Sequence, residues 1–193
     1  MGSPQAGLHS DPRWLASTAG GLLAAVAALW GMRGPPLRLA RFWVSPFPLF
    51  AAGLVGGPLA GVGASLRAGV VIAFLANWYA GAVFLGAFGL PAALMALLAF
   101  RRGTLDAGRA AIVLGLWPAV AILTAGVVAA GQSGGLDGVL RKVTEHALAQ
   151  AGVAAPEGAV AGMARIMPGA IGFWFAVLLA ANAAGAQGFL ARR

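Results

Sequence analysis

Arg67 offers the most chemistry in this sequence, because its charge lies between two long uncharged stretches. If these stretches form a membrane helix, a charge at its centre costs roughly 2.5–3.5 kcal/mol on insertion scales, so it is a functional candidate by default. The alternative is an arginine in a loop, or one whose side chain reaches back to the membrane surface. Its expected partner is a backbone carbonyl, an anionic ligand, an acid of another subunit, or one of Ser65, Asn77, Asn182 and Gln187.

The acidic residues limit what Arg67 and any proton-coupled mechanism can use. All five lie outside the long uncharged windows: Asp11, Asp106, Asp137, Glu145 and Glu157. Proton-driven carriers commonly place Asp, Glu or His within the membrane. The sequence therefore disfavours an autonomous proton-driven transporter.

The remaining polar and amphipathic groups within the apolar segments complete the candidate ligand-binding set. This set consists of Arg67, Asn77, Trp78, Tyr79 and Asn182. In lipid, a lone amide finds a partner helix or a ligand. The alternative roles are structural: an amide that joins two helices, or aromatic rings that anchor at the membrane surface.

Residues for enzymatic chemistry are missing or badly spaced. The chain has no cysteine, and its two histidines, His9 and His146, do not form an H-E-x-x-H arrangement. Ser17, Ser45 and Ser65 lack a G-x-S-x-G context, and no phosphate-binding glycine loop is present. We therefore expect neither an enzyme nor a bound cofactor or metal.

Composition places the chain in a membrane. Hydrophobic residues make up 60% and charged residues 9% of its 193 residues, and the mean hydropathy is +0.86. A soluble domain carries roughly 25% charged residues, so this chain lacks the polar surface for water. The net charge of +8 comes from arginines between apolar runs, which is typical of membrane topology signals and not of nucleic-acid binding.

Five windows contain no Asp, Glu, Lys or Arg, and a membrane-spanning helix needs about 20 apolar residues. These windows are Trp14–Met32, Phe42–Leu66, Ala68–Phe100, Ala110–Leu136 and Ile166–Ala191. We expect an all-α bundle of about six membrane helices in one domain, residues 1–193, with a flexible N-terminus at 1–13. The number is five if residues 37–55, which Pro46 and Pro48 would kink, form a re-entrant element instead of a span.

The long third window is expected to break at Asn77–Gly81, where a polar cluster meets a glycine. The preceding helix then begins near Gly57, which places Arg67 near its middle. The following helix, Gly81–Phe100, is expected to bend where Pro91 follows Gly89. The alternative break, at residues 89–91, leaves Arg67 in a loop.

Residues 132–167 form the one sizeable polar stretch and are expected to be an extramembrane helical loop. Apolar residues recur at helical spacing over 136–151, which predicts an amphipathic helix closed by Gly152. A second short helix is expected from Pro156, and the last span over residues 168–190.

Small residues recur every four positions in two places, which lets helix backbones approach closely in lipid. The expected packing and docking positions are Gly20, Ala24, Ala28, Gly53, Gly57 and Gly61.

Arginine placement predicts the orientation. The loop 101–109 and the C-terminus hold five arginines and one acid, which favours the cytoplasm, whereas 132–167 is expected outside. The N-terminus is then inside if residues 37–55 span the membrane and outside if they do not.

Three apolar motifs carry a resemblance to a known family. They are residues 46–57 (PFPLFAAGLVGG), residues 86–94 (GAFGLPAAL), and residues 167–170 (MPGA) followed by Asn182 and residues 186–188. Over about residues 15–193 the chain resembles the YybS-like family of bacterial membrane proteins, a domain of unknown function. Members of that family are expected to continue past the equivalent of Arg193 with a linker and further membrane helices.

The resemblance implies the fold of the substrate-binding subunits of energy-coupling-factor vitamin transporters, which dock a partner membrane subunit through small-residue seams. On that analogy Ala24 and Ala28 are docking positions. We therefore expect a multi-pass protein of the bacterial inner membrane that binds a solute and acts with other membrane subunits. The alternative is a membrane scaffold or assembly factor without a ligand. The first requires a polar cavity near Arg67, Asn77 and Trp78.

Overall fold

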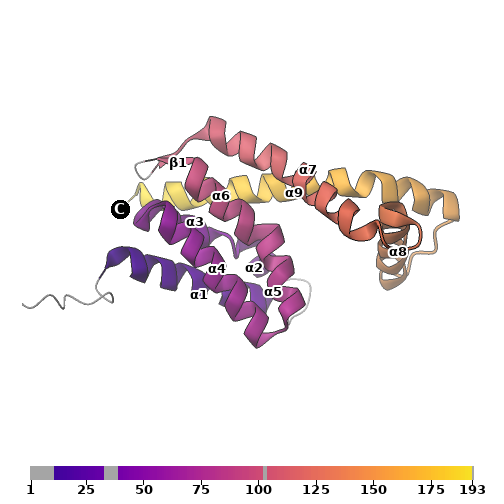
Figure 1. Cartoon of the computed structure of the whole chain (residues 1–193), viewed down its shortest axis with the longest axis horizontal. Coiled ribbons are helices and arrows are strands. Elements are labelled where there is room, and N and C mark those ends of the chain that lie inside the picture. Colours follow the sequence, from indigo (N-terminus) through magenta and orange to yellow (C-terminus); the bar gives the residue numbers. More distant parts are fainter. Residues whose placement is uncertain (1–10, 33–38, 102–103, 193) are drawn as a thin grey trace, which may run out of the picture. The chain divides into compact units, whose positions relative to one another are not determined.

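The computed structural model describes residues 11–32, 39–101 and 104–192 (Figure 1). Nearly all of these residues are helical, and the two-residue strands Phe100–Arg101 (β1) and Thr104–Leu105 (β2) pair antiparallel. The expected all-α class is confirmed. The chain divides into two compact units, residues 1–114 with 177–193 (unit 1) and residues 115–176 (unit 2). The expectation of a single domain stays a prediction.

Within the described ranges, five helices are long and apolar enough to cross a membrane. They are α1 (Pro12–Met32), α4 (Pro58–Leu75), the helix Trp78–Leu98, α7 (Ala107–Ala129) and α9 (Glu157–Leu190). The segment expected to span the membrane or to be re-entrant, residues 37–55, contains two shorter helices. They are α2 (Leu39–Val44) and α3 (Phe47–Gly56), and Ser45 and Pro46 separate them. The expected kink at the prolines is therefore a complete break.

The broken segment α2–α3 returns along α1 from one end to the other. A Cβ on Gly31, near the end of α1, would lie 2.7 Å from the Cβ of Phe42 in α2. A Cβ on Gly56, at the end of α3, would lie 3.1 Å from the Cβ of Ala16 near the start of α1. The two ends of the segment thus lie at opposite ends of α1.

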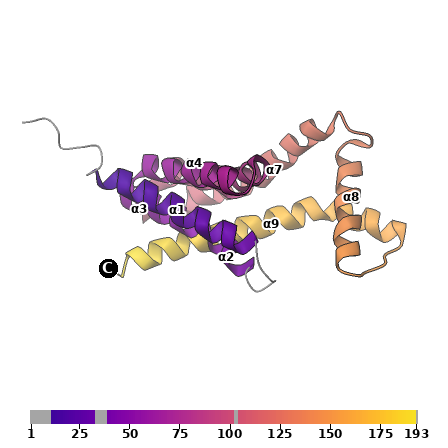
Figure 2. The ribbon, with the colours of Figure 1, turned by 90° about the horizontal axis from the view of Figure 1, so that it is seen from below.

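Helix α4 then runs parallel to α1, and the two lie side by side in both ribbon views (Figures 1 and 2). Ser17 contacts Gly63, and Gly21 contacts Ala64 and Arg67 further along both helices. Two sequential helices of span length can run parallel only if the chain between them returns. Helices α2 and α3 supply this return, and that they form a sixth crossing of the membrane stays a prediction.

The turn after α4 lies where the sequence predicts it. Helix α4 ends at Leu75, and the side chain of Asn77 accepts a hydrogen bond of 2.8 Å from the backbone N–H of Ala80. This side-chain cap begins α5 (Trp78–Phe84). The break at Asn77 and the start of α4 next to Gly57 are both confirmed, so Arg67 lies in the middle of a helix.

Helix α5 continues through a π-helical turn, η3 (Leu85–Gly89), into α6 (Leu90–Leu98). Pro91 lacks an N–H group, and its ring would clash with the carbonyl four residues earlier in a regular α-helix. A wider turn directly before the proline relieves that clash without ending the helix. The expected bend at Pro91 thus corresponds to a π-helical turn.

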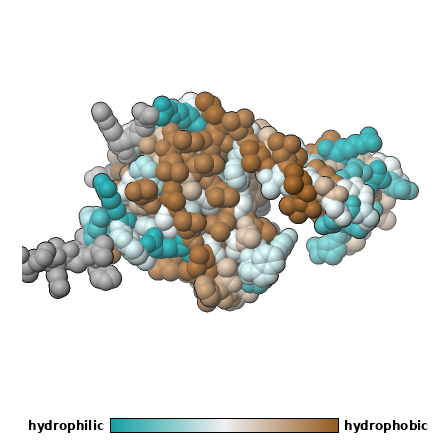
Figure 3. All heavy atoms as spheres, in the orientation of Figure 1, coloured by the Kyte–Doolittle hydropathy of each residue, from teal (hydrophilic) through white to brown (hydrophobic). Residues whose placement is uncertain are grey.

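The core of unit 1 combines small residues at the helix contacts with a cluster of phenylalanines. Phe50, Phe84 and Phe88 are fully buried, and the rings of Phe42 and Phe88 meet edge to face with centroids 5.1 Å apart. Apolar side chains also cover the middle of the visible outer face of unit 1 (Figure 3). A helical bundle that is apolar both inside and outside is suited to lipid.

Unit 2 contains the second half of α7, helix α8 (Gly135–Gln150) and the first half of α9. The expected amphipathic helix at 136–151 is confirmed as α8, and Gly152 follows it with a φ of +70°. Thr144, Ala147 and Leu148 of α8 face Met163 and Met167 of α9 across a small apolar cavity of about 320 Å³.

Helix α9 corrects one expectation. Residues 157–190 form one continuous helix, whereas a short helix and a separate span from Pro168 were expected. A proline removes one helix hydrogen bond, but apolar membrane helices tolerate this loss because neighbouring groups and small local adjustments compensate. Gly172 of the same helix packs on Pro118 of α7, where a Cβ would lie 2.7 Å from the proline ring.

Candidate functional site

Arg67 lies half-buried between α4 and α1, and its side chain is engaged by α1. One guanidinium nitrogen (Nη1) donates a hydrogen bond to the hydroxyl of Ser17. The guanidinium carbon lies 4.2 Å from the ring centroid of Trp14, which is a cation–π contact. Neither Ser17 nor Trp14 was expected as a partner from the sequence.

Two glycines make room for this arrangement. A Cβ on Gly63 would lie 2.8 Å from Nη1 of Arg67 and 2.5 Å from the hydroxyl oxygen of Ser17. A Cβ on Gly21 would lie 3.0 Å from the Cβ of Arg67. A larger residue at Gly63 would collide with the guanidinium, and one at Gly21 would push α1 and α4 apart.

The side chain of Arg67 reaches towards the start of α1. Its backbone lies nine residues beyond Pro58, or roughly 13 Å along α4, whereas Trp14 is the third residue of α1. Helix side chains tilt towards the helix N-terminus, which points Arg67 in this direction. The geometry therefore favours the alternative of an arginine that reaches back from mid-helix.

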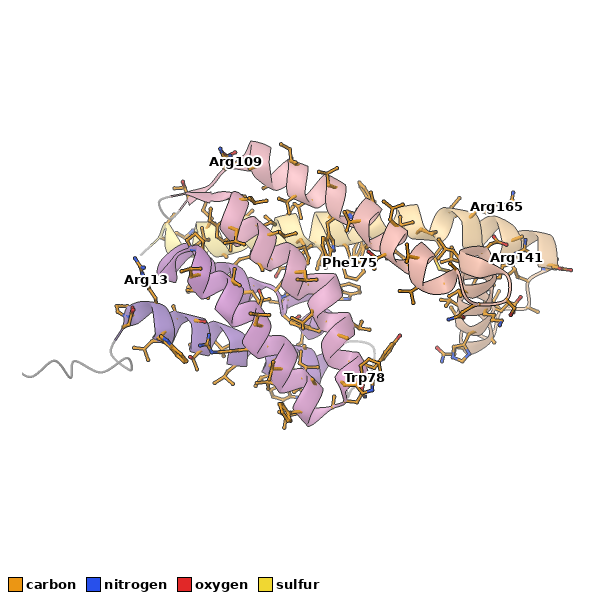
Figure 4. All side chains as sticks on the ribbon, in the orientation of Figure 1. Arg13, Trp78, Arg109, Arg141, Arg165 and Phe175 are labelled. Atoms are coloured by element: carbon orange, nitrogen blue, oxygen red, sulfur yellow. The ribbon has the colours of Figure 1, made fainter. Side chains whose placement is uncertain are left out.

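The start of α1 lies at an arginine-rich end of unit 1. Arg13, the α3–α4 turn and Phe100 of β1 line one cavity of about 290 Å³ there. The side chain of Gln187, near the end of α9, accepts a hydrogen bond of 3.2 Å from the backbone of Leu105 in β2. Arg13 and Arg109 are both seen towards this end (Figure 4). We call this region the arginine end.

Asn77, Trp78 and Tyr79 lie at the turn between α4 and α5, beyond the far end of α4 from Pro58. Trp78 and Tyr79 are 77% and 65% exposed, and their rings meet edge to face. The Asn77 side-chain oxygen caps α5. The structure therefore does not bring these residues together with Arg67, and their exposure is typical of interfacial anchors.

Asn182 of α9 forms a hydrogen bond to the backbone at the break between α2 and α3. Its amide nitrogen donates to the carbonyls of Trp43 at 3.0 Å and of Leu178 at 2.9 Å. The hydroxyl of Ser45 donates to the carbonyl of Phe42 at 2.7 Å. The carbonyls of Trp43 and Phe42 belong to the last turn of α2, where side chains commonly supplement the backbone hydrogen bonds.

The prolines act on the other side of the same break. Helix α3 begins at Phe47, and its first turn would present unpaired N–H groups. Pro46 and Pro48 have no backbone N–H group, so neither residue leaves an unpaired donor at this helix start. Unpaired backbone groups are costly in an apolar environment, so this combination lowers the cost of the break. The sequence signal was present in the prolines, but the partner Asn182 is 139 residues from Trp43.

The small-residue positions pack within the chain. Ala24 and Ala28 are fully buried, so their surfaces are not free to dock a partner. Cβ atoms on Gly20 and Gly61 would lie 2.7 Å from the Cβ atoms of Ala52 and Ala96, respectively. Gly53 packs on Phe100 and Ala96 of the neighbouring elements.

Gly57 has a different role. It joins α3 to α4 with a φ of +83°, and nothing lies within 4 Å of an added Cβ. Gly53, Gly57 and Gly61 therefore do not share one helical face, because Gly57 and Pro58 end the helix between the other two. Gly53 and Gly61 still meet, since a Cβ on Gly61 would lie 3.1 Å from the Cα of Gly53.

Three cavities of about 290–320 Å³ lie among the described residues. Arg67, Asn77, Trp78, Tyr79 and Asn182 line none of these three. One of them is an apolar groove between α1 and α3, lined by small residues such as Ala16, Ala19 and Ala51. The described ranges also contain no cluster of three His, Cys, Asp or Glu side chains that could hold a metal ion.

Comparison with protein-family models, with curated proteins and with solved structures finds no match to this chain.

Proposed function

We propose that this protein is a multi-pass membrane scaffold or assembly subunit that holds other membrane proteins and does not itself carry a solute. The observation that carries the proposal is the use of its intramembrane polar groups. Arg67 binds Ser17 and Trp14, and Asn182 binds the backbone of Trp43. A solute carrier needs such groups to converge on a ligand, whereas a scaffold uses them to fix its own helices.

The proposed topology has six crossings, with α2–α3 as one broken crossing. It places the N-terminus, the loop 101–109 and the C-terminus in the cytoplasm, and residues 132–167 outside. Arg13, the β1–β2 hairpin and the end of α9 lie at the same end of unit 1, which supports an even number of crossings. The arginines at this end favour the cytoplasmic side of a bacterial inner membrane.

Helices α7 and α9 supply the proposed partner surface. Helix α7 is the most apolar of the five long helices. Exposed apolar residues follow α7 at helical spacing, among them Leu116, Val120, Leu123 and Val127. Membrane helices associate through close packing, and α7 interleaves these residues with alanines and glycines.

The second candidate is the solute-binding subunit of a transport complex, as the resemblance to the YybS-like family implies. The observation in its favour is the break between α2 and α3, because discontinuous helices commonly form substrate sites in transporters. Against it, the side chains of Ser45 and Asn182 already occupy carbonyls at this break.

Photo-crosslinking in native membranes tests the scaffold proposal. A photoreactive amino acid at Leu116 or Leu123 of α7 should give the same discrete crosslinked protein from both positions. The matched control is Leu66 on the outer face of α4, which is also about half exposed and should give no such product. A single small solute that copurifies with the protein, identified by mass spectrometry and lost in Asn182→Ala, would instead support the transport candidate.

A further inference from the structure

We propose that Arg67, Trp14 and Arg13 bind the phosphate group of an acidic phospholipid in the leaflet at the arginine end of unit 1. The argument begins with the donors of Arg67. Its guanidinium carries five N–H groups. Among the described residues, Ser17 is the only hydrogen-bond partner of that guanidinium. The other contact, with Trp14, engages the face of the guanidinium and leaves its edge for an acceptor.

The charge of Arg67 is also uncompensated within the described part of the chain. Both ion pairs found there, Arg109–Asp106 and Arg141–Asp137, involve other arginines. The nearest acid along α1 is Asp11, whose carboxylate accepts a hydrogen bond of 2.9 Å from the backbone N–H of Arg13 at the start of the helix. An anionic acceptor would stabilise a half-buried guanidinium beside lipid, and a phosphate group fits its forked donors.

Arg13 supplies a second positive charge on α1, one turn before Ser17. It precedes Ser17 by four residues, so the two share one face of α1 one turn apart. Arg13 is exposed at the arginine end, where its side chain is seen in Figure 4. A phosphate between Arg13 and Arg67 would lie at the depth of Trp14, and tryptophan rings favour the headgroup level of a bilayer.

The surroundings favour a lipid over free phosphate. Leu66 and Val70 flank Arg67 on α4, and both expose about half of their surface, as Trp14 does on α1. Acyl chains can lie along these residues while the phosphate reaches the guanidinium. This proposal depends on the membrane location of the protein and not on its scaffold role.

Native mass spectrometry of the detergent-purified protein tests the site. The probes are phosphatidylglycerol, diacylglycerol with the same acyl chains, and inorganic phosphate. We expect the wild type to bind phosphatidylglycerol and not diacylglycerol, and we expect millimolar inorganic phosphate not to displace the lipid. Arg67→Gln should weaken phosphatidylglycerol binding at least tenfold, because it removes a charged hydrogen-bond donor. Arg109→Gln, at an exposed arginine paired with Asp106, should change it less than twofold.

Arg13→Gln provides a second variant that does not depend on the packing of α4. Arg13 is exposed, so this substitution should leave the fold intact. We expect it to weaken phosphatidylglycerol binding about fivefold. Equal binding by the wild type and both variants would overturn the proposal, as would equal binding of diacylglycerol. Displacement by millimolar inorganic phosphate would identify a free-phosphate site instead. None of these results would alter the crosslinks from α7, so the lipid site and the scaffold role fail separately.

Discussion

Substitution of Gly61 by alanine measures how tightly the helices of unit 1 pack. An added Cβ would lie 2.7 Å from the Cβ of Ala96 in α6. Carbon atoms in contact normally lie about 3.5–4.0 Å apart, so the two helices must separate by about 1 Å. Overpacking of this kind typically lowers the free energy of unfolding by about 1–3 kcal/mol. Alanine also stabilises a helix by about 1 kcal/mol relative to glycine, which opposes this loss.

The same substitution at Gly115 isolates the helix-forming contribution. Gly115 lies within α7, and nothing is within 4 Å of its added Cβ. The difference in unfolding free energy between Gly61→Ala and Gly115→Ala is therefore the overpacking cost, about 1–3 kcal/mol. Reversible unfolding in mixed detergent micelles, followed by tryptophan fluorescence, measures both values.

A double substitution identifies the responsible contact. Ala96→Gly removes the methyl group that an alanine at position 61 would clash with. The loss of unfolding free energy caused by Gly61→Ala should therefore be smaller in the Ala96→Gly background. The relief is partial, because the Cα of Gly53 lies 3.1 Å from the same added Cβ. An identical cost of Gly61→Ala with alanine or glycine at position 96 would refute the proposed close approach of α4 and α6.

Three further predictions follow from the break, the turns and the topology. Asn182→Ala should lower the unfolding free energy by about 1–2 kcal/mol in the same micelle assay, because the carbonyl of Trp43 loses its tertiary donor; an unchanged value would contradict the capping role. Gly57→Ala should cost about 1–3 kcal/mol through backbone strain alone, since its φ is +83° and the space around it is open; a neutral result would contradict that turn geometry. In the cysteine-free chain, cysteines at exposed Tyr79 and Thr104 should react with an impermeant maleimide from opposite sides of the membrane; labelling from one side would contradict six crossings.

The membrane class and most helix boundaries could be predicted because lipid imposes simple rules on length and polarity. The turn at Asn77 combined a capping side chain with interfacial aromatics, and both signals are local. The start of α4 next to Gly57 followed from the length that a span requires. Amphipathic spacing similarly identified α8.

Features that depend on tertiary contacts were not accessible from the sequence. The continuity of α9 through Pro168 depends on compensation around the proline, which spacing does not reveal. Gly53, Gly57 and Gly61 have the repeat of one helical face, but the positive φ of Gly57 separates two helices. Ser17 and Trp14 could not be assigned to Arg67, because the parallel alignment of α1 and α4 depends on how α2–α3 returns.

The repair of the α2–α3 break also has a consequence for how the protein is made. Trp43 leaves the ribosome 139 residues before Asn182, whose side-chain amide donates a hydrogen bond to the Trp43 carbonyl. Until the final helix is inserted, the segment α2–α3 lacks this hydrogen bond to α9. Nascent chains that stop short of Asn182 should therefore be preferred substrates of membrane quality-control proteases, however well their earlier helices have been inserted.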